Sequence, residues 1–226
     1  GVGNLWRFPY LAAKDGGGLF LIVYLALVLT FGFTLLTSDI AIGRRTHKSA
    51  IGAYEAMQPK WKFLGILTFL VPVLIMTYYA VIGGWITKYA VTYLTGGAQA
   101  AAGDGYFTSF ITSPVAPVVF ALLFMGATAL IVYNGVEDGI ERVSKYMMPV
   151  LLVLVVVIAG YALTLRHTDE TGALRTGMEG LRYYLTPHVE GLTVGRFLQT
   201  LLDAMSQLFF SLSVSMGIMI TYGSYV

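Results

Sequence analysis

Long runs of apolar residues, separated by short polar stretches, dominate this chain of 226 residues. A helix that crosses a lipid bilayer needs roughly 20 consecutive apolar residues. Five runs are long enough, and they occupy residues 19–43, 63–95, 114–133, 146–165 and 197–226. The pattern therefore predicts an all-α membrane protein, with the lipid bilayer as its surroundings.

Shorter elements connect these runs. Residues 1–15 are predicted to form a half-helix, which ends at the glycine-rich turn Lys14-Asp15-Gly16-Gly17-Gly18. Residues 134–145 carry several charges and are predicted to be a loop. Residues 166–196 form the longest polar segment, in which apolar positions at helical spacing predict an amphipathic surface helix.

Basic residues set the expected orientation. The loop between the first two long runs has only one acidic residue, Glu55, and five basic ones: Arg44, Arg45, Lys48, Lys60 and Lys62. Loops rich in lysine and arginine tend to stay in the cytoplasm. We therefore expect this loop to be cytoplasmic and the segment 166–196 to be extracellular.

The composition excludes several classes of function. Apolar residues make up 57% of the chain and charged ones 12%, and the net charge of +2 does not indicate a nucleic-acid partner. With no cysteine, this sequence has no disulfide or thiolate metal site. It also shows no metal cluster, nucleophile–base pair or cofactor motif, so we do not expect an enzyme. A start without methionine or a secretory leader suggests a piece of a longer protein.

The opening residues GVGNLWRFPY contain the first candidate site. A helix that begins near Val2 or Gly3 presents free backbone N–H groups and the positive end of its dipole, and both favour an anion such as a carboxylate. Glycine and asparagine before a helix are also common as plain caps. Arg7, inside an apolar run one turn after Asn4, favours the anion site.

The last apolar run contains the second candidate site. Ser211, Ser213 and Ser215 alternate, and residues two apart share a side of an extended segment but not of a helix. The spacing fits a local break in the helix, eased by Gly217. Serines bonded to the carbonyls of the preceding turn are the other explanation. A break inside a membrane is tolerated only where it lines a cavity or is buried in protein.

Three further polar residues lie within apolar runs. Tyr79 is close to the middle of its run, and a buried phenol usually finds a partner. Asp39 and Asp203 need partners because a charge inside a membrane is costly. We expect structural roles for both aspartates.

Two long motifs carry a family resemblance. GVGNLWRFPY followed by Asp15-Gly16-Gly17-Gly18 resembles the first helix of the neurotransmitter:sodium symporter family. Gln207-Leu208-Phe209-Phe210-Ser211-Leu212-Ser213, followed by Thr221-Tyr222-Gly223-Ser224-Tyr225, resembles its sixth helix. The resemblance implies an inverted-repeat sodium symporter fold with discontinuous helices 1 and 6. This chain would run from the break in helix 1 through helix 6.

The resemblance also implies roles for individual residues. The backbone N–H groups of Val2 and Gly3, with the Tyr79 hydroxyl, would hold a substrate carboxylate. The residues implied to contact the rest of the substrate are Ile75, Phe210, Ser211, Ser213 and Met216. Asn4 and Ser211 would give oxygens to one sodium ion, and hard oxygen ligands suit a hard cation. The residues implied to form the extracellular gate are Arg7, Gln207 and Phe210.

The implied function is sodium-coupled import of apolar amino acids by alternating access, with chloride left open. Ser215 stands where the family usually has glycine, so its hydroxymethyl group could reduce the pocket. The loop 96–113 is short and has no glycosylation sequon, which favours a prokaryotic transporter in the inner cell membrane. A non-transporting sensor or accessory subunit built on the same fold is the alternative.

Overall fold

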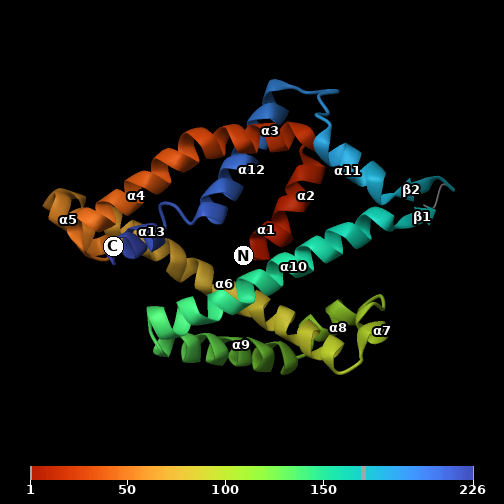
Figure 1. Ribbon diagram of the computed structural model, residues 1–226, viewed down its shortest axis with the longest axis horizontal. Helices are drawn as coiled ribbons and strands as arrows, with labels where there is room; N and C mark the ends of the chain where they lie inside the picture. The colour runs from red at the N-terminus through yellow and green to blue at the C-terminus, as the bar shows by residue number, and fades with distance from the viewer. Residues whose placement is uncertain (1, 169–171, 226) are drawn as a thin grey trace. The chain divides into compact units, whose positions relative to one another are not determined.

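The computed structural model describes residues 2–168 and 172–225. Gly1 of the opening motif, residues 169–171 of the predicted extracellular segment and Val226 at the end of the last run lie outside the described residues. The chain divides into two compact units, one made of Gly1–Val71 with Val157–Val226 and one of Pro72–Val156. Figure 1 shows the elements of both units along the chain.

Four helical segments of the described residues are long and apolar enough to cross a membrane. They are Gly18–Thr46, Pro59–Leu94, Ala116–Tyr133 and Val136–Thr164. The fifth predicted run is divided into two shorter helices, as described below. The protein is therefore a multi-pass, mainly helical membrane protein, as the apolar pattern predicts.

The first unit contains both ends of the chain. Its N-terminal elements are α1 (Val2–Leu5), α2 (Arg7–Lys14), α3 (Gly18–Leu27), the π-helix η1 (Val28–Gly32), α4 (Phe33–Thr46), α5 (Ala50–Met57), η2 (Pro59–Trp61) and the beginning of α6 (Lys62–Leu94). Its C-terminal elements are β1 (Arg166–Thr168), β2 (Leu174–Thr176), α11 (Gly177–Leu185), α12 (Val194–Leu212) and α13 (Ile218–Gly223).

The main core of this unit lies where α12 packs against α2 and α3 (Figure 1). Phe20 and Leu208 are almost completely buried there. The rings of Phe8 and Phe20 meet edge to face with centroids 5.4 Å apart, and Phe8 meets Tyr24 in the same way at 4.9 Å. The aromatic rings join α2 to α3, and Leu208 brings α12 into the same core.

The glycine turn after α2 allows a second close contact. Gly16 and Gly17 both have positive φ angles, of 85° and 59°, which glycine adopts without steric cost. A Cβ atom on Gly17 would overlap the carbonyl oxygen of Tyr183 at the end of α11. The turn thus needs glycine for its backbone conformation and for the approach of α11.

The short helix α13 packs against α4 through two glycines. A Cβ on Gly43 would meet the carbonyl oxygen of Ile220, and one on Gly223 would lie 2.5 Å from the carbonyl oxygen of Ile40. Close backbone approach through small residues is typical of helix packing in membranes. This contact fixes the second half of the broken helix.

The segment 166–196 contains the predicted helix, α11, and also a hairpin that was not predicted. β1 and β2 form an antiparallel hairpin, and only then does α11 begin. A capping box between Thr176 and Glu179 starts the helix. Short exposed strands give almost no periodic signal, so the apolar spacing alone did not reveal them.

The second unit consists mainly of long helices. It holds most of α6, α7 (Ala98–Ala101), α8 (Tyr106–Ile111), α9 (Ala116–Tyr133), η3 (Val136–Glu141) and most of α10 (Arg142–Thr164). The prediction of a loop at residues 134–145 was wrong, because helical structure begins at Val136 and continues to Thr164. Glu137 and Asp138 lie in its first turn, where the helix dipole favours acidic residues.

Candidate functional site

The last apolar run contains a break in its helix. α12 ends at Leu212, α13 begins at Ile218, and the residues between them are not helical. Ser213 and Ser215 have φ angles of 52° and 59°, and Gly217 has 73°. Left-handed backbone is uncommon for serine and costs about 1–3 kcal/mol per residue. The discontinuity predicted for this helix is therefore present, although the backbone turns there rather than running extended.

A buried carboxylate supports the break. The backbone N–H of Ser215 donates a 2.9 Å hydrogen bond to Asp39 Oδ2, from α4. Asp39 is only 6% exposed. Because the break leaves N–H groups without helical partners, a carboxylate acceptor there stabilises it. The structural role expected for Asp39 agrees with this contact.

A trio of polar side chains joins the first helix to α12. Ser211 Oγ donates to Asn4 Oδ1 over 2.6 Å. Gln207 Nε2 donates to both of these oxygens, over 3.1 Å in each case. Gln207 and Ser211 are four residues apart and thus lie on the same face of α12. The two oxygens that the family resemblance implies as ion ligands are neighbours in the structure.

Gln207 also has an unused acceptor. Its side chain is completely buried, and its Oε1 has no hydrogen-bond partner among the described residues. A buried polar atom without a partner costs about 1–3 kcal/mol. A cation or a hydrogen-bond donor placed at Gln207 Oε1 would remove this cost.

Phe210 covers the start of the chain. A Cβ atom on Gly3 would lie only 2.5 Å from Phe210 Cε1. Gly3 is buried and Phe210 is half-buried. The residue at position 3 thus has to be glycine for the aromatic ring of α12 to approach the first helix this closely.

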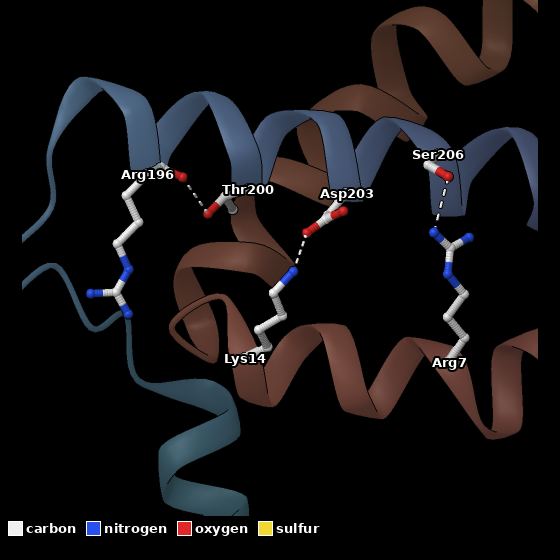
Figure 2. A network of polar contacts seen from close by, with 6 residues as sticks. All are labelled: Arg7, Lys14, Arg196, Thr200, Asp203 and Ser206. Atoms are coloured by element: carbon white, nitrogen blue, oxygen red, sulfur yellow. Dashed lines mark hydrogen bonds and ion pairs between the residues drawn. The ribbon is translucent and has the colours of Figure 1, made fainter.

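Polar side chains connect α2 and α12 further along the two helices (Figure 2). Arg7 Nη2 donates to Ser206 Oγ over 3.1 Å, and Lys14 Nζ forms an ion pair of 2.8 Å with Asp203 Oδ2. Arg7 thus has a serine as its partner on α12. Asp203 pairs with Lys14, which agrees with the structural role expected for this aspartate.

The predicted site residues are divided between the two units of the chain. Val2, Gly3, Asn4, Arg7 and the predicted residues between 207 and 216 belong to the first unit. Ser213 and Met216 lie in the break between α12 and α13. Ile75 and Tyr79 belong to α6 within the second unit, and their part in the site stays a prediction.

Three contacts of this region were not predicted from the sequence. They are the Asp39–Ser215 hydrogen bond, the Arg7–Ser206 hydrogen bond and the Lys14–Asp203 ion pair. The polar residues inside apolar runs were a usable signal that each needed a partner. Which partner each would take depends on how distant helices pack, so the sequence pattern could not identify it.

The fold and the site together define a class of protein. Several helices can cross a membrane, a further apolar run is broken into α12 and α13, and polar oxygens from two helices meet beside this break. Irregular backbone at a binding site is the arrangement found in secondary transporters. A sequence model of the Sodium:neurotransmitter symporter family matches residues 1–103 and 111–226. The chain belongs to this family and has its fold.

Individual relatives agree with the family assignment. The chain is 37% identical to the "Uncharacterized sodium-dependent transporter YhdH" of Bacillus subtilis, and it spans 48% of that protein. It is 35% identical to the "Uncharacterized sodium-dependent transporter MJ1319" of Methanocaldococcus jannaschii, and it spans 46% of it. All of this chain is covered in both comparisons.

A solved structure has the same fold. The crystal structure of MhsT in complex with L-phenylalanine matches the chain with a TM-score of 0.85 and 38% sequence identity. The match covers 100% of this chain and 50% of the MhsT chain. The chain thus spans about half the length of the proteins that it matches.

Proposed function

We propose that this chain contributes to a sodium-coupled transporter that imports apolar amino acids by alternating access. The observation that carries the proposal is the contact between Asn4 Oδ1 and Ser211 Oγ beside the break in the helix. Family membership and the names of the sodium-dependent relatives support the same function.

The chemistry of the trio supports sodium as the coupled ion. Asn4 Oδ1 and Ser211 Oγ are uncharged oxygens, and a hard cation prefers oxygen ligands. The hydroxyl proton of Ser211 now lies between them, so the hydroxyl would rotate to turn a lone pair toward an ion. The amide of Gln207 donates to both oxygens and would have to release them at the same time.

The beginning of the chain supports a carboxylate as the second ligand of the site. The family resemblance assigns the carboxylate to the backbone N–H groups of Val2 and Gly3, which belong to α1. The family resemblance adds the hydroxyl of Tyr79 as a further donor. A substrate carboxylate held there would lie close to the ion ligand Asn4, and each would favour the binding of the other.

The side chains around the break support an apolar substrate. Phe210 and Met216 are half-buried, and the family resemblance adds Ile75 to the pocket. A charged substrate side chain among them would be buried without a partner, which is costly. Met216 can repack around different shapes, whereas Ser215 would restrict size if it faced the ligand. L-phenylalanine is the amino acid in the MhsT complex.

The experiment that tests this function is uptake by the intact protein in liposomes. We expect an inward gradient of sodium, but not one of choline, to drive the accumulation of labelled L-phenylalanine inside the liposomes. Unlabelled leucine, valine or methionine should inhibit uptake, whereas glutamate and lysine should not. Replacing chloride by another anion in the same assay shows whether transport uses chloride. The proposed location of the protein is the cell membrane of a prokaryote.

Two outcomes would contradict the proposal. Uptake that is equal in sodium and choline would exclude sodium coupling. Sodium-dependent binding of phenylalanine without any accumulation would favour the alternative, a sensor or accessory subunit on the same fold.

A further inference from the structure

The turn after α2 buries a carboxylate oxygen that has no hydrogen-bond donor among the described residues. Asp15 is only 6% exposed, and its Oδ2 accepts no hydrogen bond from any described residue. An ionised carboxylate buried in this way is costly, because it loses its water and gains no donor. A ligand that supplies positive charge or a donor at this atom would remove the cost.

The neighbour of Asp15 on α12 is a second carboxylate. Asp203 lies beside the turn, where it contacts Lys14, and its carboxylate disfavours the ionised form of Asp15. Two ionised carboxylates cannot bond, because both are acceptors only, whereas one protonated member can donate to the other. Asp203 Oδ2 already accepts from Lys14 Nζ over 2.8 Å (Figure 2), so a proton on Asp15 would complete a chain of three groups.

The charges around Asp15 come from each element packed against the turn. Lys14 of α2 and Arg196 of α12 favour the ionised form of Asp15, whereas Asp203 opposes it. His188, after α11, donates its backbone N–H to the carbonyl of Gly16 over 3.1 Å. Burial, followed by the charge of Asp203, raises the pKa of the Asp15 carboxyl above its usual value despite the two cations.

A proton fits this site better than a metal ion. Among the described residues, no group of three or more histidine, aspartate or glutamate side chains is arranged to hold a metal. Lys14 already occupies Asp203 Oδ2, so this oxygen is not open to a metal ion. One proton shared between two adjacent carboxyl groups needs no other ligand.

We propose that Asp15 and Asp203 form a carboxyl pair that binds one proton at the junction of α2 and α12. The proton comes from solution and adds to the carboxylate of Asp15. The resulting O–H donates to Asp203, which keeps its ion pair with Lys14, and no other bond forms or breaks. Binding of the proton ties the glycine turn to α12, and its loss leaves two negative charges side by side.

The experiment is infrared spectroscopy of the intact protein during a pH titration without substrate. We expect a carboxylic-acid C=O band that persists above the usual pKa of aspartate, about 3.9, and disappears in one step. Asp15→Asn should lack this band. Asp104→Asn, a change at an exposed aspartate of the second unit, should retain it.

Lys14→Gln is a second variant, which tests the same proton site if Asp15→Asn does not fold. Lys14→Gln removes a cation that favours ionised Asp15, so the step should move to higher pH. An unchanged band in Asp15→Asn, or an unchanged midpoint in Lys14→Gln, would overturn the proposal. Because no substrate is present, either result is independent of whether the protein transports amino acids.

Discussion

Ser211 Oγ donates a 2.6 Å hydrogen bond to Asn4 Oδ1, although 207 positions of sequence separate the two residues. Gln207, one turn before Ser211, donates to both oxygens from a completely buried position. The contact joins the first helix of the chain to the end of α12, directly before the helix breaks. This pair of oxygens forms the proposed sodium site.

Tyr79 provides a test of the carboxylate end of the site. Tyr79→Phe keeps the ring and removes the hydroxyl donor. A hydrogen bond to a charged group is worth about 1.5–3 kcal/mol, so substrate affinity should fall roughly ten- to a hundredfold. Tyr78→Phe is the matched control and should change affinity far less. Equal losses in an equilibrium binding assay would contradict a direct role for Tyr79.

Asp39 should stabilise the break between α12 and α13. Asp39→Ala removes the acceptor for the Ser215 N–H, and the loss should destabilise the folded protein by about 1.5–3 kcal/mol. Asp39→Asn keeps an acceptor oxygen and should cost less. Chemical unfolding measures the difference, and hydrogen exchange at the Ser215 amide shows where it arises. If the amide exchanges equally fast in the wild type and Asp39→Ala, the hydrogen bond has no protective role.

The apolar runs predicted much of the fold, because a long hydrophobic segment in a membrane has few alternatives to a helix. The run at 63–95 corresponds closely to α6, Lys62–Leu94. The π-helix at Val28–Gly32 was not predictable, since its extra residue per turn leaves the composition unchanged. A Cβ on Gly32 would lie 2.8 Å from Leu212 Cδ1 of α12. Glycine at this position therefore allows the close approach of a helix that is distant in sequence.

The candidate site was predicted in part. The alternating serines allowed either a break or an ordinary helix, and the family resemblance favoured the break. The motifs also selected Asn4, Gln207 and Ser211, which the structure brings together. The partners of Asp39 and Arg7 depend on packing between distant segments, which local periodicity does not encode.

Asp15 should make stability depend on pH. Its pKa is raised in the folded state, so the folded protein holds this proton more tightly than the unfolded chain. The stabilisation from Asp15 is complete below the unfolded pKa of about 3.9 and is lost as the pH rises through the raised folded value. The melting temperature of Asp15→Asn relative to the wild type should therefore increase from acid to neutral pH. A constant difference across this range would contradict the shift.

Ser211→Ala should weaken sodium binding. The change removes one proposed ligand oxygen and leaves Asn4 with the amide of Gln207. The sodium concentration for half-maximal substrate binding should rise roughly tenfold, which corresponds to about 1.4 kcal/mol. Ser38→Ala is the control, because the Ser38 hydroxyl bonds only a carbonyl of its own helix, that of Thr34. A similar rise in both variants would mean that the effect is not specific to Ser211.

Equilibrium binding of labelled L-phenylalanine to the intact protein, at a series of sodium concentrations, tests the central claim most directly. Sodium binding is then measured in the same way at a series of phenylalanine concentrations. If Asn4 and Ser211 hold an ion next to the substrate carboxylate, each ligand must raise the affinity of the other by the same factor. Phenylalanine affinity that stays unchanged when choline replaces sodium would contradict the account.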